Sequence, residues 1–169
     1  MKNEERVAVA MGSFSDFEDM GPCFSELKDL GIGFVARVVS AHRNPKDAKT
    51  WIREREHAGA EVFIAGAGMA AHLAGFIAAY SALPVIGVPL PRGELGGVDA
   101  LLSSLQMPPG VPVAVMAIGK PGAKNAAIFT AQILAIKDKP LKERLLAKHA
   151  DMEKKLLLAN EELEKRLKS

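Results

Sequence analysis

Five short apolar runs are spaced along residues 7–117, and glycine, proline or serine follows each of them within two residues. Runs of this length, without strict alternation of apolar and polar residues, are typical of strands buried on both faces of a parallel sheet. We predict strands at residues 7–11, 34–39, 62–65, 84–88 and 112–117.

The segments between these runs carry apolar residues at helical spacing. In the first segment, Met20, Phe24 and Leu27 recur every three or four residues, and Gly31 follows as a C-cap. In the second, Pro45 suits the first helical turn. We predict helices at residues 17–30, 45–57, 73–81, 98–105 and 124–136.

Strands that alternate with helices predict a parallel sheet with helices on both faces, joined by right-handed crossovers. The predicted fold is therefore α/β: a three-layer α/β/α sandwich with a five-stranded parallel sheet, of the flavodoxin or Rossmann kind. We find no internal repeat and no low-complexity linker, so we expect residues 1–169 to form a single domain.

Residues 139–169 have a different pattern, because they are highly charged and carry leucines at helical spacing. They predict one long amphipathic helix or two, outside the five βα units. Such a helix needs a further surface to cover, either the chain's own sheet or a neighbouring subunit.

Composition narrows the class of protein. The net charge is only +2, and the charges are spread along the chain, which argues against nucleic acid as the main partner. Cys23 is the single cysteine, so an internal disulfide is excluded and a reducing compartment is favoured. No signal peptide and no stretch long enough to span a membrane is visible. We expect a cytoplasmic protein without a membrane partner or a structural zinc site.

The residues that follow the five strands should meet at one edge of the sheet, where open α/β sheets bind their ligands. Ser40, His42 and Arg43 follow the second strand. A hydroxyl and a guanidinium suit an anionic group such as phosphate, and an imidazole suits proton transfer near neutral pH. The alternative is that the histidine is a solvated or capping residue.

The segment after the first strand, residues 12–16, offers backbone N–H groups at a helix N-terminus and the hydroxyls of Ser13 and Ser15. This arrangement predicts an anion site. The alternative is a capped helix, with Ser15 or Asp16 as the N-cap. Because Asp16 would repel a phosphate, we expect it to contact sugar hydroxyls.

Residues 66–71 match the pattern G-x-G-x-x-A after a strand, which can indicate a dinucleotide site. The acidic residue expected after the next strand is missing, since Val88 and Pro89 stand there. We therefore interpret the glycines as letting a ligand approach the backbone closely. His72 follows, either as a site residue or as a structural histidine that binds a backbone carbonyl.

After the fifth strand, Lys120, Lys124 and Asn125 are either ligand contacts or surface residues. Cys23, in the first predicted helix, is interpreted as a packing residue.

Taken together, several motifs resemble the N5-carboxyaminoimidazole ribonucleotide mutases of purine biosynthesis. They lie at residues 11–16, 39–45, 65–73, 84–89, 97–101, 106–113 and 117–120, and the similarity extends over about residues 6–140. The resemblance implies an enzyme that moves the carboxylate of a small-molecule ribonucleotide from N5 to C4 of its imidazole, with no metal, ATP or organic cofactor.

The resemblance also implies roles for individual residues. His42 is the general acid/base, which protonates N5 as CO2 leaves and then takes the proton from C4. The implied nucleotide contacts are Ser13, Asp16 and Arg43, with Ser15, Ser40 and Ala41 beside them, and the implied lining of the base and carboxylate region is Gly66, Ala67, Gly68 and His72. The family forms octamers with sites at subunit interfaces, so we expect a homo-octamer in which residues 139–169 take part in assembly.

The chain departs from the family pattern at three places. Met69 stands where the family usually has glycine, Ala74 stands where it usually has proline, and residues 89–96 lack the usual Gln/Lys-Ser/Thr pattern. Two alternatives follow: a 5-aminoimidazole ribonucleotide carboxylase that uses CO2 directly, and a non-catalytic nucleotide-binding homologue. Arg43 and the Ala71-His72 pair favour the mutase.

Overall fold

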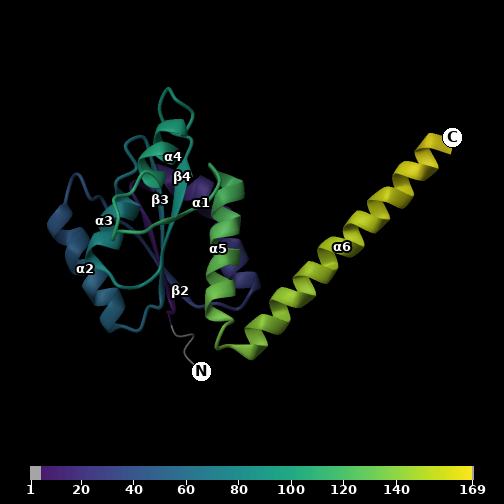
Figure 1. Cartoon of the computed structure of the whole chain (residues 1–169), viewed down its shortest axis with the longest axis horizontal. Helices are drawn as coiled ribbons and strands as arrows, with labels where there is room; N and C mark the ends of the chain where they lie inside the picture. Colours follow the sequence, from purple (N-terminus) through teal and green to yellow (C-terminus); the bar gives the residue numbers. More distant parts are fainter. Residues whose placement is uncertain (1–4, 169) are drawn as a thin grey trace. The chain divides into compact units, whose positions relative to one another are not determined.

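The computed structural model describes residues 5–168, and the chain divides into two compact units, one up to Thr130 and one from Ala131 onward. Figure 1 shows the order of the elements along the chain. They are β1 (Val7–Met11), the 3-10 helix η1 (Phe14–Asp16), α1 (Phe17–Asp29), β2 (Phe34–Val38), α2 (Pro45–His57), β3 (Val62–Gly68), α3 (Leu73–Tyr80), β4 (Val85–Leu90), α4 (Val98–Leu105), β5 (Ala114–Val115), α5 (Lys120–Leu134) and α6 (Lys139–Lys168).

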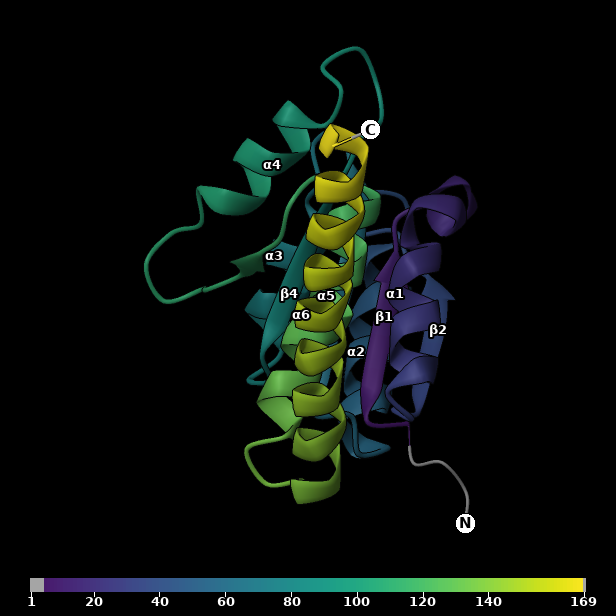
Figure 2. The same ribbon diagram turned by 90° about the vertical axis from the view of Figure 1, so that its right-hand side faces the viewer.

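The first unit confirms the predicted fold class. Its five strands are all parallel, in the order β2-β1-β3-β4-β5. Helices α2, α3 and α4 lie on one face of this sheet, and α1 and the first turns of α5 lie on the other (Figures 1 and 2). A sheet of this order is the flavodoxin-like form of the doubly wound fold.

The strand order creates a crevice between β1 and β3. From β1 the chain passes to β2 on one side, and it then returns to place β3 on the other side of β1. The loops that leave β1 and β3 therefore run in different directions above a shared pair of strand ends, Met11 and Gly66. Such a switch point is the usual ligand site in open α/β sheets.

The core explains why the central strands lack polar residues. All of β1 and β4, and β3 from Val62 to Gly66, are buried. The small alanines of β1, Ala8 and Ala10, lie on the face that α2 and α3 cover, where Trp51 of α2 meets Phe63 of β3 edge to face, with ring centroids 6.0 Å apart. β2 is an edge strand whose last three residues are exposed.

The boundaries differ most from the prediction near β5 and α5. β5 contains two residues instead of the predicted six, in part because Pro112 has no N–H to donate to a strand ladder. α5 begins at Lys120, four residues before the predicted start, with Pro121 in its first turn. This early start requires glycine at position 122, because the backbone of residue 117 occupies the space that a Cβ atom would need.

Replacing Gly122 with alanine is expected to destabilise the fold by at least about 2 kcal/mol. A Cβ atom there would come within 2.6 Å of the carbonyl carbon of Ala117 and even closer to its oxygen, and backbone cannot swing aside as a side chain can. Urea unfolding of the variant measures the loss. Gly21→Ala is the matched control: Gly21 also lies inside a helix, but nothing stands within 4 Å of its added Cβ, so this change should stabilise by up to about 1 kcal/mol. Equal midpoints for the two variants would contradict the packing argument.

The second unit contains the end of α5 and α6. α6 is one continuous helix, which decides between the two predicted possibilities. Leu141 and Leu145 are buried, whereas every residue from His149 to Lys168 is exposed, including several leucines. Among residues 5–168, no helix has the combination of length and apolar character that crossing a bilayer requires.

Candidate functional site

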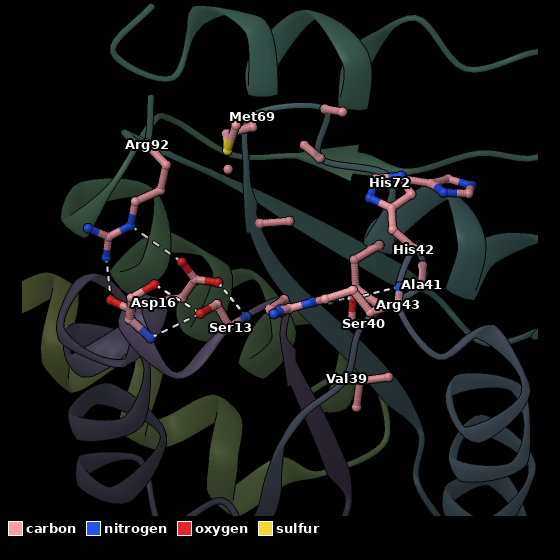
Figure 3. A pocket seen from close by; sticks show the side chains of 17 residues that line it. Ser13, Asp16, Val39, Ser40, Ala41, His42, Arg43, Met69, His72 and Arg92 are labelled. Atoms are coloured by element: carbon pink, nitrogen blue, oxygen red, sulfur yellow. Dashed lines mark hydrogen bonds and ion pairs between the residues drawn. The ribbon is translucent and has the colours of Figure 1, made fainter. Parts of the chain in front are cut away.

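A cavity of about 570 Å³ opens at the carboxyl ends of β1 to β4, at the switch point (Figure 3). Its volume is within the range of small-molecule sites. The structure brings ten of the eleven predicted site residues to its wall: Ser13, Ser15, Asp16, Ser40, Ala41, His42, Arg43, Ala67, Gly68 and His72. Gly66 is absent from that wall. It is buried, and a Cβ there would lie 2.6 Å from the Met20 sulfur, so its lack of a side chain makes room for α1.

The loop after β1 is closed by its own hydrogen bonds. Ser13 is the N-cap of η1 and forms a capping box with Asp16. Asp16 occupies the N-cap position of α1, one of the two predicted positions, but its side chain makes no capping bond there. The N–H of Ser13 donates to Asp16 Oδ2 at 2.9 Å, and the N–H groups of Ser15 and Asp16 donate to the hydroxyl and carbonyl of Ser13. Because these three donors are engaged, they do not point free N–H groups at an anion, and side chains become the main candidates for anion recognition at this loop.

Arg43 is the side chain best placed for an anion. Its Nη2 donates to the carbonyl oxygen of Gly12 at 2.8 Å, and its Nε donates to the Ser40 hydroxyl at 3.2 Å. These bonds tie the loop after β2 to the loop after β1 and fix the plane of an exposed guanidinium. Figure 3 shows it extending from the Ser40 side of the cavity toward Ser13. A planar guanidinium held in this way suits a phosphate or carboxylate.

His42 and His72 come from different loops and meet at the cavity. Their ring centroids are 5.0 Å apart at an interplanar angle of 33°, and both residues are exposed (Figure 3). His72 lies at the N-cap position of α3, where its side chain makes no capping bond; its ring packs edge-on against Phe76 instead. The geometry therefore favours the site interpretation of His72 over the structural one.

Asp16 is the buried acid of the site, with 4% of its surface exposed. Burial raises its pKa, while the Ser13 N–H and the Arg92 guanidinium act in the opposite direction. Arg92 follows β4 and lines the cavity, but the sequence analysis did not select it. Its position could have suggested a role, because Arg92 is a basic residue in the loop after the fourth predicted strand, at the edge where the site was expected.

Met69 also lines the cavity, and its side chain is 60% exposed. Its φ of 56° is in the left-handed region, as is the φ of 33° at Ala71. Left-handed backbone costs a residue with a Cβ roughly 1–2 kcal/mol, so glycine is the residue that this position favours on conformational grounds.

The backbone of Met69 gives a measurable expectation. Met69→Gly should be more stable to thermal unfolding than Met69→Ala by about 1 kcal/mol, because both variants lose the thioether side chain but only alanine keeps a Cβ in the left-handed region. Ala79→Gly against wild type is the reference, since Ala79 lies in helix α3, where glycine should be the less stable residue. Alanine at least as stable as glycine at position 69 would contradict the observed backbone.

The remaining candidates lie outside the cavity wall. Lys120 pairs with Glu18 at 2.8 Å and Lys124 lies 3.9 Å from Glu26, so both take part in ion pairs along the helices. Cys23 is buried, and burial raises the pKa of its thiol to about 12, which confirms the packing interpretation. Within residues 5–168, no three His, Cys, Asp or Glu side chains are grouped so that they could hold a metal ion.

Comparisons with known proteins show which family the chain resembles. A family model described as AIR carboxylase matches residues 6–155. A Saccharolobus solfataricus protein named N5-carboxyaminoimidazole ribonucleotide mutase is 51% identical over 152 residues, which are 90% of this chain and 95% of that one. An Escherichia coli protein of the same name is 49% identical over 143 residues, which are 85% of each chain.

Solved structures are also similar to this chain. The crystal structure of Treponema denticola PurE has a TM-score of 0.85 to this chain at 29% identity, and the match covers 93% of this chain and 97% of that one. These matches confirm the resemblance predicted from the motifs. The chain belongs to the AIR carboxylase family.

Proposed function

We propose that this chain is a cytoplasmic N5-carboxyaminoimidazole ribonucleotide mutase of purine biosynthesis. The observation that carries the proposal is the meeting of His42, Arg43 and Asp16 in one cavity, in a chain about half identical to proteins of that name. An acid/base can transfer the proton, a cation can bind the phosphate, and a carboxylate can accept hydrogen bonds from ribose hydroxyls.

The proton balance of the reaction requires one group that both gives and takes a proton. The imidazolium of His42 donates its proton to N5 as the N5–carboxylate bond breaks and CO2 leaves. C4 then forms a bond to the same CO2, and neutral His42 removes the proton from C4, which restores the aromatic ring and the imidazolium. An imidazole can perform both steps near neutral pH.

The other groups bind the nucleotide in this proposal. Arg43 holds the phosphate, with the Ser13 and Ser15 hydroxyls beside it, and Asp16 accepts hydrogen bonds from the ribose hydroxyls. Ala67 and Gly68, at the carboxyl end of β3, present backbone to the base and carboxylate. Both residues are part of the cavity wall, which supports this role.

Retention of CO2 requires a covered cavity, because water and diffusion compete with recapture. In the single chain both His42 and His72 are exposed. We propose that neighbouring subunits of a homo-octamer supply the cover and that residues 139–169 take part in assembly; the exposed leucines of α6 support this. The solution mass should be eight times the 18.0 kDa of one chain, and a monomer at working concentration would contradict the proposal.

The proposed activity is tested with purified protein in the absence of metal ions and ATP. One arm supplies N5-carboxyaminoimidazole ribonucleotide, the other supplies the uncarboxylated ribonucleotide with bicarbonate, and absorbance follows the C4 product. Conversion in the first arm alone is expected. Efficient conversion in the second arm at modest bicarbonate would assign the carboxylase activity that the family description names. Bound nucleotide with no product in either arm would indicate a non-catalytic homologue.

A further inference from the structure

Arg92 lies on the opposite side of the cavity from His42 and His72, and other residues hold its side chain in place there (Figure 3). Its Nε lies 3.4 Å from Asp16 Oδ1, and its Nη2 lies 2.6 Å from Asp19 Oδ2 and donates to the carbonyl oxygen of Ser15. One side chain from the loop after β4 thus contacts three residues of the η1–α1 segment, Ser15, Asp16 and Asp19. Its planar fork, with several donors, is suited to such a set of acceptors.

The end of β3 is shaped to seat this side chain. A Cβ atom on Gly68 would lie 2.5 Å from Arg92 Cβ and 2.6 Å from its Cγ, so the glycine leaves the space that the arginine stem occupies. The stem therefore crosses bare backbone before its guanidinium reaches Asp16. Because the stem fits this space, we interpret the observed conformation of the Arg92 side chain as part of the site, and not as one of many alternative surface rotamers.

Arg92 compensates a charge that burial disfavours. The side chain of Asp16 is 5% exposed, and its Oδ2 already accepts the Ser13 N–H, so Oδ1 is the oxygen that faces Arg92. Asp19 lies near and adds negative charge, which raises the pKa of Asp16 further. Without Arg92, two carboxylates would share this corner of the site, and Asp16 would lose the cation that acts on it; Lys120 acts on Asp19 instead.

We propose that Arg92 is a positioning residue that keeps the Asp16 carboxylate ionised and aimed at the ribose hydroxyls of the substrate. The proposal rests on the function proposed above. The other charged or titratable groups on the cavity wall are Arg43, His42 and His72, which come from the loops after β2 and β3; the groups that act on Asp16 itself are Arg92 and Asp19.

The test compares Arg92→Gln and Arg92→Lys with wild type. The glutamine variant removes the cation, so KM for N5-carboxyaminoimidazole ribonucleotide should rise about 10-fold with kcat changed much less, and the acid limb of log(kcat/KM) should move about one unit to higher pH. The lysine variant keeps the positive charge but lacks the planar guanidinium with its several donors. In this variant the acid limb of log(kcat/KM) should stay at its wild-type pH, while KM remains higher than in wild type.

A second readout does not depend on turnover. In protein labelled with 13C at the aspartate carboxyls and assigned with Asp16→Asn, the pKa of Asp16 should be higher in Arg92→Gln than in wild type. Arg55→Gln is the matched control. Arg55 is not part of the cavity wall, and its Nη1 lies 3.1 Å from Glu5 Oε2, so this change should leave KM, the acid limb of the pH profile and the titration of Asp16 unchanged.

The outcomes separate the two proposals. An unchanged Asp16 titration, or a lost kcat with unchanged KM, in Arg92→Gln would overturn the positioning role. A wild-type protein that fails to convert the substrate would overturn the proposed function, while the carboxyl titration would still decide whether Arg92 controls Asp16.

Discussion

Replacement of His42 with asparagine is expected to lower kcat by at least about 10³-fold and to leave nucleotide affinity within about 3-fold of wild type. The amide can neither give a proton to N5 nor take one from C4, so both halves of the reaction lose their acid/base. Binding should persist because the ring makes its observed contact with His72 and none with Arg43 or Asp16. Turnover of N5-carboxyaminoimidazole ribonucleotide and calorimetric binding of the uncarboxylated ribonucleotide measure the two effects.

A second histidine serves as the control for this variant. His57 lies at the end of α2, exposed, with its Nδ1 2.7 Å from the carbonyl oxygen of Arg53, and it lines no part of the cavity. His57→Asn should keep wild-type turnover. Normal turnover in His42→Asn would remove His42 from the chemistry and leave the other groups of the cavity to explain it.

Replacement of Arg43 with alanine is expected to raise KM by roughly 10- to 100-fold, the range set by loss of a charge-assisted contact worth about 1.5–3 kcal/mol. The phosphate does not react, so its binding is similar in the ground state and the transition state, and kcat should change little. Steady-state kinetics with N5-carboxyaminoimidazole ribonucleotide separates KM from kcat.

The phosphate role itself can be isolated with inhibitors. Ribose 5-phosphate should compete with the substrate in wild type far better than ribose does, and Arg43→Ala should abolish most of that difference. Arg37→Ala is the control, because Arg37 pairs with Asp47 at 2.9 Å on β2 and α2 and is not part of the cavity wall. An Arg43→Ala variant that still distinguishes the two sugars would assign the phosphate to another group.

The fold could be predicted because its main determinants are local. Strand β1 contains only buried apolar residues, so its run is short, uninterrupted and easily recognised. Pro45 and Gly31 mark the limits of neighbouring helices by their own backbone preferences. Once the strands are known to be parallel, the residues after them must share an edge, which is why ten predicted residues reach one cavity wall.

The features that escaped prediction depend on contacts between distant segments. Gly66 resembles a ligand-facing glycine in sequence, but only the packing of Met20 shows that its missing side chain serves α1. Arg92 becomes a site residue through acids 76 and 73 positions earlier, and no local pattern encodes that pairing. The engaged N–H groups after β1 likewise depend on the capping box of η1, a short 3-10 helix that was not predicted before α1.

In the proposed reaction the carboxylate that leaves N5 is the one that arrives at C4, and an isotope label tests this most directly. Substrate carrying 13C in its N5-carboxylate is converted in an excess of unlabelled bicarbonate, without metal ions or ATP, and the C4 product is examined by mass spectrometry. We expect most of the label to be retained in the product, because CO2 is recaptured within the cavity. Product with the isotope content of the added bicarbonate would contradict it and would indicate a carboxylase that draws CO2 from solution.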